Sequence, residues 1–271
     1  MTTVRDLQAM AGDEPITMLT AYDAVTAALV ESAGVDVVLV GDSMGNAVLG
    51  HEDTLPVTVD EMASRVGAVA RGTDDALVVA DMPFLSFGAD EAESVKNCGR
   101  MLKEEGANAV KLESGPHTVS LTERLADLGI PVMAHLGLTP QSVNQTGYTQ
   151  QASDREEAKE ILDLARAHED AGAFALVLEH VPANLAAQVT EALDIPTIGI
   201  GAGGDCDGQV LVFTDVVGLA ESSPPFAEQF GDVRGEVESA VDDYVEAVES
   251  GDFPGQRHAN TAEDLDDLYS G

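Results

Sequence analysis

The sequence has no tryptophan, few other aromatic residues, two cysteines and few basic residues. Aromatic residues make up 4% of its 271 residues. Cys98 and Cys206 stand alone, with no CxxC pair that would indicate a zinc site, a redox motif or a disulfide framework. No apolar run approaches the roughly 18 residues of a membrane-spanning helix, and the opening "MTTVRDLQAM" lacks the charged and apolar regions of a signal peptide. These absences predict a protein of the reducing cytoplasm.

The shortage of basic residues leaves a strongly acidic chain. Lysine and arginine number 13 against 49 aspartates and glutamates, which gives a net charge of −36. Such a chain repels nucleic acids and anionic membranes, so neither is an expected partner. Salt weakens the mutual repulsion of the acidic residues, because the Debye length is only about 3 Å at 1 M. We therefore expect a halophilic cytoplasmic protein, the alternative being an acidic protein that works at ordinary salt.

Short β-branched runs alternate with longer amphipathic stretches along the whole chain. Eight strands separated by helices, in about 250 residues, are typical of a (β/α)8 TIM barrel. A doubly wound open sheet is the alternative, because the pattern does not reveal closure. The predicted strands are residues 16–23, 35–43, 77–84, 108–113, 130–137, 173–180, 195–203 and 208–215.

Helix starts and chain ends complete this prediction. Capping-box pairs are expected at Thr58 with Glu61, Ser120 with Glu123 and Ser153 with Glu156. Residues 2–13 predict a short N-terminal helix that caps the barrel floor, and residues 230–251 predict a terminal helix. We assign residues 1–250 to a single barrel domain and residues 251–271 to an acidic C-terminal tail.

Titratable residues end five successive predicted strands: Asp42, Asp81, Glu113, His135 and Glu179. In a barrel these strand ends meet on one face, where enzymes of this fold place their chemistry. Asp42 alone could be an ordinary helix cap or turn residue. Five such residues in succession indicate an active site.

Three of the five are carboxylates, which cannot all be ionised close together without a cation. Asp42, Asp81 and Glu113 offer hard oxygen ligands, which favour Mg²⁺. Lys111 lies two residues before Glu113 and points the same way; it either forms a structural ion pair or holds an anion that develops on the substrate. The apolar run before Glu179 favours a general base there.

The remaining candidates are less specific. His135 either contacts the substrate or supports a residue that does, and His180 is expected to point to the other side of its strand. The loops 43–57 and 138–152 exceed the usual two to six residues and suggest a lid. "GIGAGG" (199–204) matches G-x-G-x-x-G, but a strand follows it, so we reject a dinucleotide site.

Several long segments carry a specific resemblance, among them "VGDSMGNAVLGHEDTLPVT", "HLGLTPQSVN" and "IPTIGIGAGGDCDGQVLV". From about residue 3 to residue 250 the chain resembles the ketopantoate hydroxymethyltransferase family. That family consists of (β/α)8 barrels of the phosphoenolpyruvate/pyruvate group, which form homo-oligomers, often decamers. The chain departs from the family at 149–152, where relatives often read Lys-x-Gln-Gly, and at Thr214–Asp215, where a His-Asp pair is common.

The resemblance implies an activity. The family transfers a one-carbon unit from methylene-tetrahydrofolate to 3-methyl-2-oxobutanoate through an enolate, giving 2-dehydropantoate for pantothenate and coenzyme A biosynthesis. The implied partners are this keto acid and a reduced pterin, with a methanopterin-type carrier as an alternative in some archaea. By motif, Asp42, Asp81 and Glu113 would hold one Mg²⁺ per subunit, Asp42, Ser43, Asp81 and Lys111 would contact the keto acid, and Glu179 would accept the proton.

Two other functions stay open at this point. A carbon–carbon lyase or mutase of the same barrel group would also use Mg²⁺ and an enolate. Those enzymes typically carry a cysteine or lysine on a gating loop, whereas neither Cys98 nor Cys206 ends a predicted strand that faces the site. A non-catalytic binding barrel is the second alternative, and the complete set of matching site residues argues against it.

Overall fold

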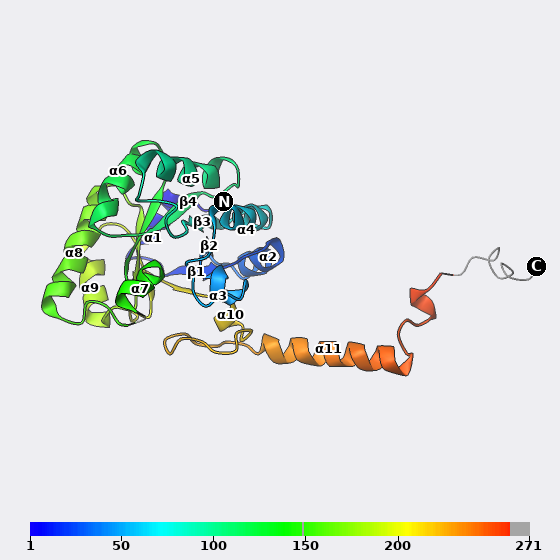
Figure 1. Cartoon of the computed structure of the whole chain (residues 1–271). Coiled ribbons are helices and arrows are strands. Elements are labelled where there is room, and N and C mark those ends of the chain that lie inside the picture. The colour runs from blue at the N-terminus through cyan, green and yellow to red at the C-terminus, as the bar shows by residue number, and fades with distance from the viewer. Residues whose placement is uncertain (148, 261–271) are drawn as a thin grey trace, which may run out of the picture.

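Eight parallel strands close into a barrel, each hydrogen-bonded to the next in chain order and β8 to β1. The computed structural model describes residues 1–147 and 149–260 (Figure 1). Closure confirms the barrel and excludes the open sheet. The strands are β1 (Ile16–Thr20), β2 (Val37–Val40), β3 (Leu77–Asp81), β4 (Ala109–Glu113), β5 (Val132–Gly137), β6 (Ala175–Glu179), β7 (Thr197–Ile200) and β8 (Gly208–Leu211).

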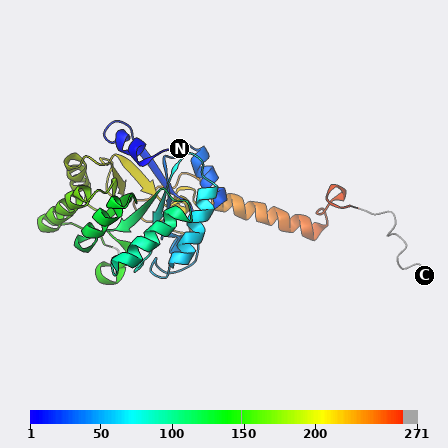
Figure 2. The same cartoon turned by 90° about the horizontal axis from the view of Figure 1, so that it is seen from above.

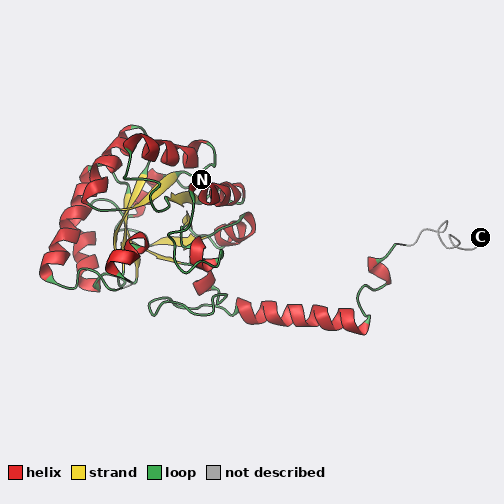
Figure 3. Cartoon of the chain, in the orientation of Figure 1, coloured by secondary structure: helices red, strands yellow, loops and turns green. Residues whose placement is uncertain are grey.

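Six helices cover the outside of the barrel after β1 to β6 (Figure 3). They are α2 (Ala24–Ser32), α4 (Val59–Arg71), α5 (Glu91–Lys103), α6 (Val119–Asp127), α8 (Arg155–Asp170) and α9 (Ala183–Ala192). The capping box at Thr58 and Glu61 is confirmed. The other two predicted boxes are wrong: α6 continues directly from a 3₁₀ turn, Pro116–Thr118, and Asp154 rather than Ser153 caps α8.

The barrel floor is closed by α1 (Val4–Met10), as predicted. Leu7 of this helix is fully buried and belongs to the apolar cluster inside the barrel. The N–H groups of Thr2 and Gly12 donate to Asp75 and Asp207, which lie just before β3 and β8. The floor is therefore the face of strand beginnings, and the opposite face is left open for a site.

Apolar packing fixes which strand residues point inward. Leu77 and Val79 of β3, Ala109 of β4 and Val177 of β6 belong to the cluster inside the barrel. Because strand side chains alternate, Asp81, Lys111, Glu113 and Glu179 must point inward as well. Alternate residues such as Val78 and Val110 pack against the helices instead.

The last long helix, α11 (Val233–Ser250), projects away from the barrel (Figures 1 and 2). None of its residues is buried. In the described part of the chain, only the four-residue α10 (Phe213–Val216) lies between β8 and this helix. The barrel wall is correspondingly thin there: Thr17 of β1 and Gln209 of β8 are exposed, while β2, β3 and β4 are buried throughout.

None of the helices in residues 1–147 and 149–260 combines the length and apolar character needed to cross a bilayer. Of the predicted acidic tail, residues 261–271 lie outside the described residues. The assignment of residues 1–250 to one domain stays a prediction.

Candidate active site

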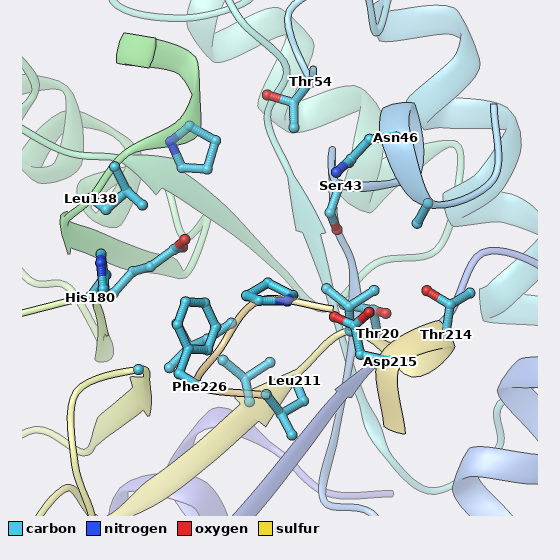
Figure 4. Close-up of a pocket in the computed structure, with 18 of the residues that line it drawn as sticks. Thr20, Ser43, Asn46, Thr54, Leu138, His180, Leu211, Thr214, Asp215 and Phe226 are labelled. Carbon is cyan, nitrogen blue, oxygen red and sulfur yellow. The ribbon is translucent and has the colours of Figure 1, made fainter. Parts of the chain in front are cut away.

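The predicted site residues line one cavity of about 1070 Å³ at the carboxyl ends of the strands. Figure 4 shows this cavity, with Ser43, Asn46 and Thr54 on one side and Leu211 and Phe226 on another. The barrel therefore brings together all the residues selected from the strand ends: Asp42, Ser43, Asp81, Lys111, Glu113, His135 and Glu179.

The three carboxylates and the lysine are buried together. Lys111 Nζ lies 2.9 Å from Asp81 Oδ1, and both side chains are almost completely buried. Burial, and then the nearby charge of Asp81, raise the pKa of Asp42 to about 7. Burial and the charge of Asp42 also raise the pKa of Glu113 well above its usual value. One lysine is too little positive charge for three buried carboxylates, so this part of the cavity is electrostatically suited to a cation.

Gln141 joins two of these carboxylates, and the sequence analysis missed it. Its side-chain Nε2 donates to Asp42 Oδ2 at 2.8 Å and to the carbonyl of Met82 at 2.8 Å. Its backbone N–H donates to the carboxylate of Glu113 at 3.0 Å. A buried amide within the quoted "HLGLTPQSVN" segment was the available signal, but only the barrel places Gln141 next to Asp42.

Gln141 thus donates hydrogen bonds to Asp42 Oδ2 and to the carboxylate of Glu113. Among the described residues, no three aspartate, glutamate, histidine or cysteine side chains form a ready set of metal ligands. The chemistry of the donors still fits a hard divalent cation, since all three are carboxylates and their excess negative charge is buried.

His135 links Lys111 to Glu179. Lys111 Nζ lies 3.3 Å from His135 Nδ1, and His135 Nε2 lies 3.2 Å from Glu179 Oε2. A lysine ammonium can only donate, so Nδ1 must accept and Nε2 must carry the imidazole proton. Burial and the charge of Lys111 lower the pKa of His135, which keeps the ring neutral. His135 Nε2 therefore faces a Glu179 oxygen at close range without making a well-aligned hydrogen bond to it.

Tyr22 and Ser43 form a second, partly buried polar pair. Tyr22 Oη and Ser43 Oγ lie 2.9 Å apart. Burial raises the pKa of Tyr22 to about 12, so the phenol keeps its proton. Tyr22 follows β1 and was missed because titratable residues were selected only at the ends of the second to sixth strands, while the neighbouring Asp23 caps α2.

Three details differ from the sequence predictions. His180 lines the cavity instead of pointing away, because its backbone adopts a left-handed conformation (φ 49°) that breaks the strand alternation. Thr214 and Asp215 lie in α10 rather than in the eighth strand. Both long loops contribute to the cavity wall, through residues such as Asn46 and Leu138, and they contain the short helices α3 (Met44–Ala47) and α7 (Val143–Thr146). Their role as a lid stays a prediction, and residue 148 lies outside the described residues.

The fold is shared with solved structures of low sequence identity. A phosphoenolpyruvate phosphomutase from Streptomyces platensis subsp. rosaceus matches with a TM-score of 0.62 and 16% identity, over 92% of this chain and 88% of that one. A 2,3-dimethylmalate lyase, a member of the PEP mutase/isocitrate lyase superfamily, matches with a TM-score of 0.58 and 18% identity, over 98% and 94%. These matches show the same barrel fold.

Sequence comparison is far more specific. The family model described as ketopantoate hydroxymethyltransferase matches residues 1–256. A 3-methyl-2-oxobutanoate hydroxymethyltransferase of Haloarcula marismortui is 84% identical over 99% of this chain and 100% of its own length. The enzyme of that name from Natronomonas pharaonis is 70% identical over 98% and 99%. Both organisms are halophilic archaea, which agrees with the acidic composition. The chain belongs to the ketopantoate hydroxymethyltransferase family.

Proposed function

We propose that this chain transfers a hydroxymethyl group to 3-methyl-2-oxobutanoate, giving 2-dehydropantoate, with methylene-tetrahydrofolate as the carbon donor. The observation that carries this proposal is the convergence of Asp42, Asp81, Lys111, Glu113 and Glu179 in one cavity of a chain that the family model matches over residues 1–256. The acidic chain has no feature that attracts a membrane or nucleic acid, so we propose a cytoplasmic location.

Asp42, Asp81 and Glu113 are the residues that would hold Mg²⁺. The cation would supply Lewis-acid stabilisation of negative charge on the substrate's oxygens. It would also balance the buried carboxylates, whose charge exceeds that of Lys111. This proposal rests on the three carboxylates and their charge, since Gln141 donates hydrogen bonds to Asp42 Oδ2 and to the carboxylate of Glu113.

Glu179 is placed to take the proton from C3 of the keto acid. As that C–H bond breaks, its electron pair moves toward the keto oxygen, and the ammonium of Lys111 lies close enough to the cluster to hold the developing charge. His135 Nε2 lies 3.2 Å from one Glu179 oxygen, so the neutral ring would help to position this carboxylate beside the substrate. C3 then forms a bond to the one-carbon unit, whose two bonds to nitrogens of the carrier break. One water supplies the hydroxyl group, and the carrier nitrogens take up the proton from C3 and the second proton of the water before the reduced pterin leaves. Loops 43–57 and 138–152 would keep bulk water from protonating the enolate before the new bond forms.

Product formation tests this proposal. Purified chain in molar KCl with Mg²⁺ and both substrates should release 2-dehydropantoate, detected by mass spectrometry. Asp42→Asn should lower the rate by about 100-fold, the usual scale for losing one electrostatic group of a site. Asp75→Asn makes the same change on the barrel floor and should leave the rate unaltered. Equal rates for the two variants would contradict the site assignment.

We also propose that the protein is a homo-oligomer in which α11 packs on a second copy of the chain. The helix carries an exposed apolar stripe: Val233, Val237, Val241, Tyr244, Val245 and Val248. These residues recur at three- and four-residue spacing on one face. Apart from Tyr244, whose ring lies 5.8 Å from that of Phe253, the residues of the stripe are left exposed among the described residues, although such faces are normally buried.

The barrel offers a matching vacancy. Among the described residues, no long helix covers the barrel between β8 and α2, and α2 carries Val25 and Leu29 with 72% and 59% exposure. An 18-residue helix is about 27 Å long and 10 Å wide. Two reciprocally exchanged helices would bury about 1100 Å² of surface in total, which exceeds the roughly 1,000 Å² expected of a biological interface. Exchange would complete both barrels and make residues 1–250 one structural unit.

Light scattering after size exclusion in molar KCl tests the exchange. The protein should contain an even number of chains, and Val237→Glu with Val241→Glu should reduce it to smaller species. Ser239→Glu with Ser250→Glu adds the same charges on the opposite side of α11 and should not. Leu29→Glu, on the receiving surface, should act like the stripe variant. An unchanged mass for the stripe variant would contradict the proposal.

A further inference from the structure

One side of the cavity is formed by residues that take no part in the proton transfer. Among them are Leu211, Asp215 and Phe226 (Figure 4), and Gly201 also lines the cavity. Pockets of 300–1,000 Å³ hold drug-sized ligands, so a cavity of about 1070 Å³ is much larger than a five-carbon keto acid requires. The unused side has room for a second and larger substrate.

An aromatic and apolar surface covers this side. The ring of Phe226 packs so closely on Gly201 that a Cβ there would lie 2.9 Å from it. The Phe226 and His180 rings are 5.6 Å apart and inclined by 41°. Leu211, next to them, also faces the cavity (Figure 4). Such a surface suits a flat heteroaromatic ring.

Asp215 adds a carboxylate to the same side. The residue is 8% exposed, and its Oδ1 accepts a hydrogen bond from Ser223 Oγ at 2.8 Å. Within residues 1–147 and 149–260, no cation pairs with it and no donor other than Ser223 reaches its side chain. A buried carboxylate with one hydrogen bond is costly. Burial also raises the pKa of Asp215, and the hydrogen bond from Ser223 offsets this only in part.

The ligand that suits Asp215 must donate hydrogen bonds. An ionised carboxylate only accepts, so it repels the carboxylate of a keto acid and favours a neutral edge with adjacent N–H groups. Ser223 precedes Phe226 by three residues, so its bond to Asp215 ties α10 to the segment that carries the aromatic ring. The carboxylate and the ring surface therefore form one site.

We propose that Asp215, Phe226 and Leu211 bind the pteridine ring of the one-carbon carrier, with Asp215 accepting from its N3–H and 2-amino groups. The inference rests on the proposed function. Tetrahydrofolate and tetrahydromethanopterin share this 2-amino-4-oxo edge, so the site would read the part common to both. Glu179 and Lys111 would act on the keto acid across the same cavity.

Asp215→Asn tests the site, because asparagine keeps an acceptor for Ser223 and replaces the outer oxygen with a donor. Loss of a hydrogen bond to a charged group corresponds to about a 10- to 150-fold change. We expect KM for the carrier to rise by that factor while KM for the keto acid and Mg²⁺-dependent proton exchange at its C3 stay unchanged. Asp205→Asn, an exposed residue of the β7–β8 loop, is the matched control and should leave every parameter unaltered.

Each assay is run with methylene-tetrahydrofolate and with methylene-tetrahydromethanopterin, and Asp215→Asn should raise KM for each carrier that the native protein uses, because both present the same edge. An unchanged carrier KM would overturn the inference. Loss of C3 exchange in the variant would also overturn it, by placing Asp215 on the keto-acid side. Failure of the native protein to exchange C3 or form product would instead refute the proposed function.

A carrier analogue provides a test that does not depend on the variant's folding. With the native protein, a tetrahydrofolate in which a methyl replaces the 2-amino group should bind about 10- to 150-fold more weakly. In Asp215→Asn the analogue and the parent compound should bind alike, since the interaction is already gone. Equal binding of the two compounds to the native protein would overturn the inference.

Discussion

Replacing Lys111 with methionine should strongly destabilise the protein in the absence of Mg²⁺. The variant keeps the length and apolar body of the side chain but removes the one cation among three buried carboxylates. Lys111 Nζ is 2.9 Å from Asp81 Oδ1, with both side chains buried. Removing one partner of a buried pair costs about 3–5 kcal/mol, because the other charge is left uncompensated.

Urea unfolding at pH 8 in molar KCl measures this loss. Lys103→Met removes an exposed lysine from the last turn of α5 and should change the free energy of unfolding by less than about 1 kcal/mol. Mg²⁺ should stabilise Lys111→Met more than the native protein, because the cation then faces a larger uncompensated charge. If Lys111→Met were as stable as Lys103→Met without Mg²⁺, the electrostatic account of the cluster would be wrong.

Three further predictions concern stability. Gln141→Leu leaves Asp42 Oδ2 without its donor and should lower the free energy of unfolding in urea by about 1–3 kcal/mol. Gln188→Leu, at an exposed position of α9, should change it little. Burial lowers the pKa of His168, so below about pH 6.5 the unfolded chain binds a proton that the folded chain does not bind. The free energy of unfolding should therefore fall as the pH is lowered from 7 to 5, and it should fall less in His168→Phe. Dilution from 2 M to 0.1 M KCl should lower the thermal midpoint, since the net charge of −36 is then poorly screened; an unchanged midpoint would contradict a salt-dependent fold.

The sequence was most informative where local pattern and topology agree. Asp81, Glu113 and Glu179 end strands whose inward positions are fixed by alternation, so the strand pattern alone places them in one cavity. Asp42 lies two residues beyond the end of β2 and still reaches the cluster, where its N–H contacts Asp81. The motif resemblance and the strand ends selected the same residues.

The parts that could not be predicted depend on loops and on tertiary contacts. Gln141 contacts Asp42 across 99 positions of sequence, a separation that no periodic pattern reports. His180 was misplaced because one left-handed residue reverses the direction of a side chain. Ser153 was predicted to cap α8 where Asp154 does, because both residues are good N-caps and the sequence pattern allows either. The position of α11 away from the barrel could not be predicted either, because an apolar stripe in the sequence does not show which surface it packs against.

Proton exchange at C3 of 3-methyl-2-oxobutanoate tests the central claim most directly. The measurement is NMR in D₂O and molar KCl, with protein and Mg²⁺ but without the pterin, repeated with Glu179→Gln. Exchange that requires Mg²⁺ and disappears in Glu179→Gln is the predicted result, because the enolising step then depends on this metal site and this base. Exchange at the native rate in Glu179→Gln, or exchange indifferent to Mg²⁺, would contradict the account.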